Sequence, residues 1–101
     1  MKKPRIRKTK YDLVRIVSED TGINSYTVDR VIKSTIDNIM LEVSQGNEVY
    51  IKGFGLFEPK ERAARLGRNP HDGSPVPIPA RVIPSFEPAQ RFKQVATKNL
   101  K

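Results

Sequence analysis

The segment 59–84 constrains the fold more than any other part of the chain, because it contains six prolines. Proline fixes its backbone φ and has no N–H to donate, which excludes a helix or a central strand across this segment. The segment also has few large apolar side chains, so it cannot form a hydrophobic core. We therefore expect it to be an exposed structure.

The dipeptide Asp72-Gly73 is typical of a two-residue β-hairpin turn. The segment is thus expected to form a ribbon, with 60–70 as one strand and 74–83 as its return. Pro75, Pro77 and Pro79 are two residues apart, which places their missing N–H groups on one side of the return strand. If that side faces solvent, the pairing side keeps its donors and the prolines stiffen an edge.

Two helices are expected before this segment. Apolar residues recur at helical spacing over 10–21 and 25–45, and Gly22 and Gly46 supply the two stops. At the start of the first helix, Thr9 and Asp12 resemble a capping box with Asp in place of Glu. Asn24 is a good N-cap for the second helix.

From Glu48 onward the apolar period changes to two, which predicts strands. The sequence Gly53-Phe54-Gly55 interrupts them and suits a bulge or a close backbone approach. A dinucleotide-binding loop is disfavoured here, because no third glycine follows and no helix opens. A C-terminal helix is expected over 88–98, with Pro88 in its first turn and with Phe92 and Val95 packing back.

A homodimer is expected, because the compact body is small and the apolar stripe of the second helix is wide for one short partner helix. The apolar phenylalanine side chains must also be shielded from solvent, which a second copy can do. The predicted dimer core consists of Val31, Ile32, Ile36, Ile39, Met40, Val43, Phe54, Phe57 and Phe86.

Positive charge is concentrated in particular segments of the chain. The formal net charge is +8; residues 1–10 carry six bases and no acid, whereas 11–57 carry four bases and seven acids. Residues 58–83 carry five bases and three acids. This segregation favours an anionic partner that contacts the ends of the chain and the proline-rich ribbon.

The composition argues against several other classes of protein. The chain has no cysteine and one histidine, His71, so a metal site, a cofactor site or histidine-based catalysis has no support. Nothing resembles a membrane span or a signal peptide, so a cytoplasmic protein that is not an enzyme is expected.

Four motifs resemble the bacterial histone-like family of HU and integration host factor. They are Gly53-Phe54-Gly55-Leu56-Phe57-Glu58, the run from Arg62-Ala63-Ala64-Arg65 to Asn69-Pro70, Asp72-Gly73 and Ile78-Pro79-Ala80. The resemblance extends from Thr9 to about Ala96. It implies an α+β fold in an intertwined dimer, with a helical base, a short antiparallel sheet as a saddle and one β-ribbon arm per subunit.

The resemblance divides the chain into a basic disordered tail, 1–8, and a single domain, 9–101. Within that domain it implies a helical dimerisation part, 9–46, a saddle with its arm, 47–84, and the C-terminal helix. The implied DNA-binding residues are Lys52, Lys60, Arg62, Arg65, Arg68, Asn69, Pro70 and Arg81. Pro70 matches the wedge that inserts between base pairs.

The implied function is architectural: the dimer binds double-stranded DNA in the minor groove with little sequence preference, prefers bent, nicked or gapped DNA, and associates with the nucleoid. A site-specific bending cofactor of the integration-host-factor type, working as a heterodimer, is the first alternative. An RNA-binding module is the second, although the chain lacks an aromatic stacking platform. The chain departs from the family in Asp72, which replaces the usual Thr, and in Pro59, Pro75 and Pro77.

Overall fold

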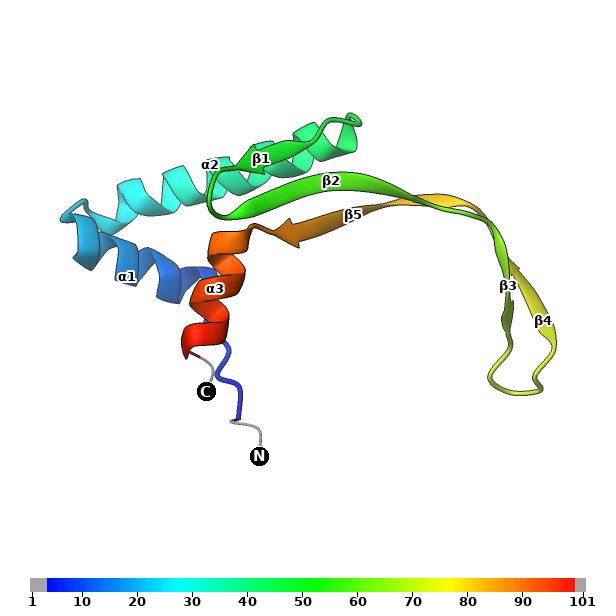
Figure 1. The fold of residues 1–101 in the computed structure, drawn as a ribbon. Coiled ribbons are helices and arrows are strands. Elements are labelled where there is room, and N and C mark those ends of the chain that lie inside the picture. The colour runs from blue at the N-terminus through cyan, green and yellow to red at the C-terminus, as the bar shows by residue number, and fades with distance from the viewer. Residues whose placement is uncertain (1–3, 100–101) are drawn as a thin grey trace. The chain divides into compact units, whose positions relative to one another are not determined.

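The computed structural model describes residues 4–99, which fall into two compact units divided between Asn38 and Ile39. Three helices and five antiparallel strands make an α+β chain, as expected (Figure 1). The elements are α1 Lys10–Thr21, α2 Ser25–Ser44, β1 Val49–Ile51, β2 Gly55–Arg62, β3 Arg65–Arg68, β4 Pro75–Ile78, β5 Arg81–Pro88 and α3 Gln90–Asn99.

The first unit contains α1 and the greater part of α2, and local capping explains where both helices start. The Asp12 carboxylate accepts hydrogen bonds from the backbone N–H and the hydroxyl of Thr9, at 2.8 and 3.1 Å. The Asn24 side-chain oxygen accepts from the Thr27 N–H at 2.9 Å. Gly22, with φ 75°, ends α1 in the left-handed conformation. The predicted helices are confirmed to within one residue.

The second unit contains a three-stranded sheet in the order β1-β2-β5. A tight turn joins β1 to β2: the Phe54 N–H donates to the Ile51 carbonyl at 2.9 Å, and Gly53 has φ 79°. The backbone at Gly55 lies very close to Phe86 and Glu87 of β5. A Cβ there would overlap the Phe86 ring and come within 2.7 Å of the Glu87 carbonyl oxygen. The predicted close backbone approach is confirmed at Gly55, whereas Gly53 supplies the positive φ of the turn.

Four phenylalanines form a cluster in the second unit. The Phe54 ring lies 5.3 Å from Phe86 and stacks on Phe92 at 5.4 Å, and Phe57 lies 4.7 Å from Phe86 between centroids. Phe92 therefore packs back from α3 as expected, whereas Val95 is exposed.

Very little of the single chain is buried. Among the described residues, the only buried hydrophobic side chains are Val14 and Val28. Of the predicted dimer core, Val31, Met40 and Phe54 are 59%, 58% and 43% exposed. Ile36 and Phe86 are also exposed, and the other members are partly buried: Ile32, Ile39, Val43 and Phe57. A chain in this state has apolar surface that a partner can cover.

Three predicted details are wrong. The ribbon strands are not continuous, since Ala63-Ala64 and Pro79-Ala80 belong to no strand. Asp72-Gly73 is not a two-residue turn, because the loop closes where Asn69 pairs with Ser74. Pro88 ends β5 rather than opening the last helix, which spans Gln90–Asn99. A missing N–H is tolerated both at an unpaired strand position and at a helix start, so proline alone did not distinguish the two.

Within residues 4–99, no helix is both long enough and apolar enough to cross a membrane. Residues 4–9 are in neither helix nor strand, and the rest of the predicted disordered tail, residues 1–3, lies outside the described residues.

Candidate nucleic-acid interface

The strand pairs β2–β5 and β3–β4 form one antiparallel ribbon with a constant register (Figure 1). Partners run from Gly55 opposite Pro88 to Arg68 opposite Pro75, and each step forward on one strand matches one step back on the other. The unpaired stretches Ala63-Ala64 and Pro79-Ala80 have equal length, so they do not change the register. Outside these two stretches, the ribbon carries its side chains in cross-strand pairs.

The hydrogen-bonding pattern nevertheless shifts once along the ribbon. The Ala89 N–H donates to the Phe54 carbonyl at 2.9 Å near the base, and the Asn69 N–H donates to the Ser74 carbonyl at 2.8 Å at the tip. Hydrogen-bonded pairs recur at every second residue of an antiparallel ladder. Phe54 and Asn69 are an odd number of residues apart, so the alternation must shift between them. The unpaired stretches at Ala63-Ala64 and Pro79-Ala80 are the only interruption of the ribbon.

The prolines of the ribbon follow this shift. Pro75 and Pro77 in β4 occupy odd positions and Pro84 and Pro88 in β5 occupy even ones, with Pro59 opposite Pro84. With the shift in place, each of these residues falls in a pair that makes no ladder hydrogen bond. The expectation that the prolines spare the pairing side is confirmed for Pro75 and Pro77, while Pro79 lies in the unpaired stretch.

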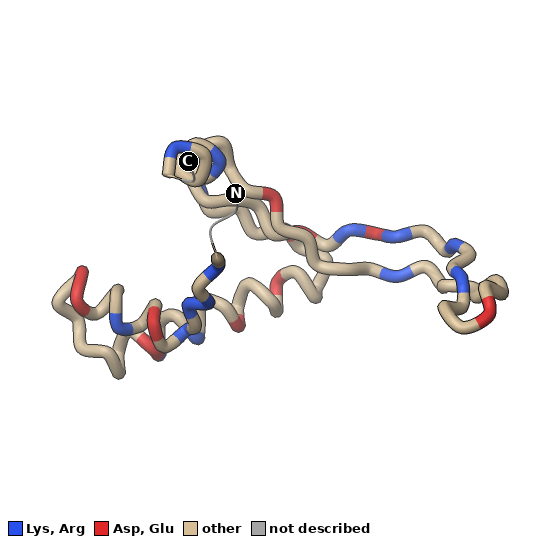
Figure 2. Tube along the Cα trace, turned by 90° about the horizontal axis from the view of Figure 1, so that it is seen from below, with Lys and Arg blue, Asp and Glu red and all other residues tan. Residues whose placement is uncertain are grey.

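The shift determines which bases share a face of the ribbon. Successive side chains alternate between faces, and the hydrogen-bonded pairs all carry theirs on the same face. Without the shift, Arg62 and Arg65 would lie on opposite faces; with it they lie on the same one. We call this the basic face; its bases are Lys60, Arg62, Arg65 and Arg81. Figure 2 shows bases along both strands of the ribbon.

The bases of the basic face outnumber the acids on the same face, Glu58 and Glu87, by four to two. Arg62 lies directly opposite Arg81, and like charges in a cross-strand pair destabilise a ribbon. Among the described residues the two ion pairs are Lys10–Asp29 at 3.2 Å and Arg15–Glu19 at 3.3 Å, both within the first unit. No base of the ribbon is neutralised in this way, so an external anion would relieve the repulsion between Arg62 and Arg81.

The tip of the ribbon is a four-residue loop, 70–73, between Asn69 and Ser74. The Gly73 N–H donates to the Asn69 carbonyl at 2.8 Å, and Gly73 has φ 74°. Pro70 is exposed. The loop therefore presents a rigid apolar ring at the far end of the basic ribbon.

The remaining predicted bases lie elsewhere. Arg68 belongs to the face opposite the basic face, and its Nη1 donates to the Gly73 carbonyl at 3.0 Å. Lys52 is exposed in the turn between β1 and β2 and is not part of the ribbon strands. The structure therefore brings four of the six predicted bases together and leaves these two apart.

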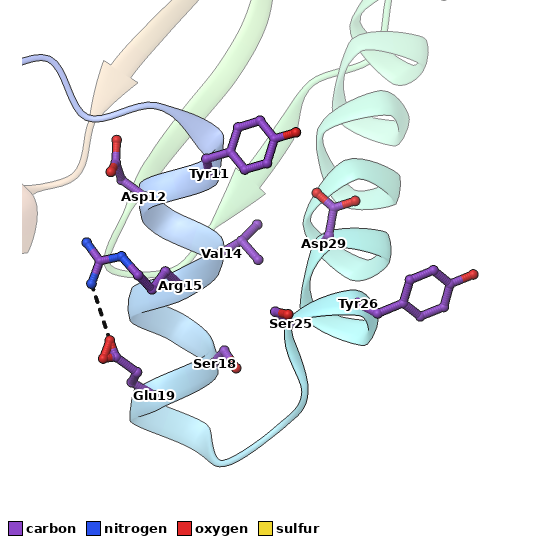
Figure 3. Close-up of a pocket in the computed structure, with 9 residues that line it drawn as sticks. All are labelled: Tyr11, Asp12, Val14, Arg15, Ser18, Glu19, Ser25, Tyr26 and Asp29. Carbon is purple, nitrogen blue, oxygen red and sulfur yellow. Dashed lines mark hydrogen bonds and ion pairs between the residues drawn. The ribbon is translucent and has the colours of Figure 1, made fainter.

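The first unit contains a separate groove of about 770 Å³ between α1 and α2 (Figure 3). Its lining includes two exposed tyrosines, Tyr11 and Tyr26, and three carboxylates. Each carboxylate already has a partner: Asp12 with Thr9, Glu19 with Arg15 and Asp29 with Lys10. The carboxylates of this groove therefore have partners among the described residues, unlike the bases of the basic face. Residues 4–99 contain no group of three side chains that could hold a metal ion.

Sequence reasoning missed the shift in the ribbon and the part that Asp72, Gly73 and Ser74 take in the tip. A signal for the shift was present, because the prolines change from odd positions, 75 to 79, to even ones, 84 and 88. The spacing of these prolines thus indicates whether the odd or the even positions of a strand make the ladder hydrogen bonds.

Comparison with known proteins gives a consistent result. Residues 8–97 match the family model described as bacterial DNA-binding protein. The chain is 37% identical over 84 residues to the DNA-binding protein HU of Geobacillus stearothermophilus, covering 83% of this chain and 93% of that one. It is 34% identical over 94 residues to the integration host factor subunit beta of Marinobacter nauticus, covering 92% and 96%. A structure of Anabaena HU in a cocrystal with DNA has a TM-score of 0.84 at 35% identity and covers 88% and 97%.

Proposed function

The chain belongs to the family of bacterial DNA-binding proteins, and from this we propose that it binds and bends double-stranded DNA with little sequence preference. One observation supports the proposal most directly. The ribbon carries four bases without ion-pair partners on one face and ends in an exposed proline. Phosphates would neutralise those bases, while the proline would act on the base stack.

The basic face provides affinity in this proposal. Arg62 and Arg81, held opposite each other, suit a phosphate between them, and Lys60 and Arg65 extend the contact along the duplex. Arginine can donate two parallel hydrogen bonds to a phosphate, which favours it over lysine at such positions. Arg68 keeps donors beyond the one used on Gly73, and Lys52 adds a contact from the saddle.

In this proposal Pro70 bends the DNA duplex. An apolar ring inserted between base pairs replaces lost stacking without requiring hydrogen bonds. Asn69 holds the base of the loop on which Pro70 lies. Bending a site by up to about 90° costs a few kcal/mol, so nicked, gapped or already bent DNA should bind more tightly.

A homodimer accounts for the exposed apolar surface of the single chain. The exposed stripe on α2 and the partly open phenylalanine cluster both supply surface that a second copy can cover. Two copies also supply two ribbons, which can contact a duplex from both sides. Association with the nucleoid would follow from DNA binding of this kind. No catalytic role is part of the proposal.

The test is a salt series on intact, nicked and random-sequence duplexes, with energy transfer between the duplex ends recorded in the same samples. If six to ten phosphates are engaged, the log–log slope should be about −5 to −9. Pro70→Ala should reduce bending more than binding, whereas Arg65→Ala should mainly weaken binding. A slope near zero, or no bending by the wild-type protein, would contradict the proposal.

A site-specific bending cofactor is the second candidate, favoured by the match to an integration host factor subunit over 92% of this chain. Selection from random sequences distinguishes the two. Enrichment of one site would support the specific cofactor, and enrichment of merely flexible steps would support the architectural function. An excess of double-stranded RNA as competitor tests the RNA-binding alternative.

A further inference from the structure

The tip loop is held by side chains of its own. The Asn69 Oδ1 accepts a hydrogen bond from the His71 N–H at 2.8 Å, and the Asp72 Oδ1 accepts one from the Ser74 N–H at 2.9 Å. Such bonds to the residue two positions on are typical of Asn and Asp in turns. The first half of the loop is therefore fixed by an amide and the second half by a carboxylate.

The second half is also held from the ribbon side. The Arg68 guanidinium donates to the Gly73 carbonyl at 3.0 Å, while the Asp72 carboxylate accepts from the Ser74 N–H at 2.9 Å. Gly73 has a positive φ, and glycine has more backbone freedom than any other residue, so these two bonds restrict the loop where its backbone is intrinsically freest. Together they fix the end of the loop opposite Pro70.

A carboxylate at this position has a cost for a DNA-binding arm. Hydrogen bonds from the side chain and the backbone of Ser74 lower the pKa of Asp72 below its ordinary value of 3.8, so the group is ionised at neutral pH. An ionised carboxylate beside phosphates repels them. Asp72 therefore opposes binding wherever the tip approaches the duplex.

We propose that Asp72 is a positioning residue, which holds the tip loop in the shape that presents Pro70 and thereby favours bending at the expense of affinity. The inference rests on the proposed function of Pro70 as the wedge. A wedge can deform the duplex only if its support does not yield, and a loop with preformed hydrogen bonds loses less freedom on insertion.

The experiment separates the two effects of Asp72 with two substitutions. Asp72→Asn removes the charge but keeps a side-chain oxygen for the Ser74 N–H, whereas Asp72→Ala removes both. Both measurements use one intact duplex. Dissociation constants come from a protein titration, and end-to-end energy transfer is recorded at saturating protein. The matched controls are Glu61→Gln and Glu61→Ala, since Glu61 is an exposed acid of the same ribbon outside the tip network.

Both Asp72 variants should bind about two- to fivefold more tightly at low salt, as expected when one exposed charge no longer repels the phosphates. Asp72→Asn should bend like the wild type. Asp72→Ala should lose about half of the energy-transfer change, because its wedge is no longer preorganised. At Glu61, the Gln and Ala variants should behave alike in both measurements.

Amide exchange at Ser74 checks the cause directly in the free protein: it should be slow in the wild type and in Asp72→Asn, and fast in Asp72→Ala. Equal bending by the two Asp72 variants would overturn the inference while leaving the proposed function in place. A wild-type protein that binds without bending would remove the proposed wedge and the inference together.

Discussion

Gly55 shows how one residue can be fixed by close packing rather than by its backbone angles. It does not have a positive φ, yet a Cβ at this position would overlap the Phe86 ring and approach the Glu87 carbonyl oxygen to 2.7 Å. The sheet strand that carries Glu87 cannot withdraw without breaking its pairing with β2. The absence of a side chain at Gly55 is therefore what allows β5 and the phenylalanine cluster to pack this closely.

We expect Gly55→Ala to lower the free energy of unfolding by about 1–3 kcal/mol, the usual range for overpacking. Thermal and denaturant unfolding measure this change. Ser85→Ala in β5 is the control, because it alters the same sheet without adding an atom to a filled space. Equal stability of Gly55→Ala and the wild type would show that the ring of Phe86 moves aside freely.

At the scale of elements, α1 depends on its first turn. Thr9 donates twice to the Asp12 carboxylate, and these hydrogen bonds lower the pKa of Asp12 below its ordinary value of 3.8. A lowered pKa in the folded protein means that the ionised form stabilises the fold. That contribution is fully present above pH 3.8 and is lost as the pH falls through the lowered pKa.

Asp12→Ala should therefore lower the melting temperature at pH 7, and the difference from the wild type should disappear as the pH falls through the lowered pKa of Asp12. Melting curves over a pH series measure this. Asp20→Ala, at an exposed position near the other end of α1, should show a smaller difference. A difference for Asp12→Ala that persists unchanged in acid would exclude the cap as its cause.

The ribbon shift gives a second prediction for an element. Amides of Arg62 and Arg65 should exchange slowly with solvent, and amides of Glu61 and Leu66 should exchange about tenfold faster or more. An unshifted ladder predicts the reverse for Arg65 and Leu66. Residue-resolved hydrogen exchange of the free protein therefore distinguishes the two arrangements.

Elements set by local chemistry were predictable from the sequence, and those set by pairing were not. Thr9, Asp12, Gly22 and Asn24 act within one turn of chain, so both early helices were predicted correctly. The ribbon turn was predicted at Asp72-Gly73 because that pair suits a short hairpin. The actual loop is longer, since the strand register already places Asn69 opposite Ser74.

The sequence showed which bases lie on the ribbon, but not which of them share a face. The bases of the ribbon were identified from the family motif, while their distribution between two faces depends on a shift that no single residue encodes. Arg62 and Arg65 are three apart and would lie on opposite faces of a regular strand. Only the change in proline spacing indicates that they share one.

At the scale of the whole molecule, the single chain has too little buried surface to be a self-sufficient fold. Among the described residues only Val14 and Val28 are buried hydrophobics, and Met40 on α2 is 58% exposed. A domain of this size needs more buried apolar surface or a partner. Folding and dimerisation are therefore expected to occur as one transition.

Met40→Glu tests this expectation, because a charge at a dimer core cannot be accommodated, whereas at a free surface it is harmless. Light scattering at micromolar concentration should give twice the chain mass of 11.5 kDa for the wild type and not for the variant, which should also melt at a lower temperature. Tyr26→Glu, at a more exposed site outside the predicted dimer core, should leave both unchanged. A wild-type monomer would contradict the dimer.

The placement of prolines on the ribbon also bears on what the protein does at high concentration. In a pair that makes no ladder hydrogen bond, each residue directs its N–H toward the outer edge of the ribbon. In β4 the two residues in such pairs are Pro75 and Pro77, which have no N–H. An incoming strand would find no donors along that edge. The β4 edge of one arm thus offers no N–H donors to a neighbouring copy on crowded DNA, which disfavours fibril growth from that edge.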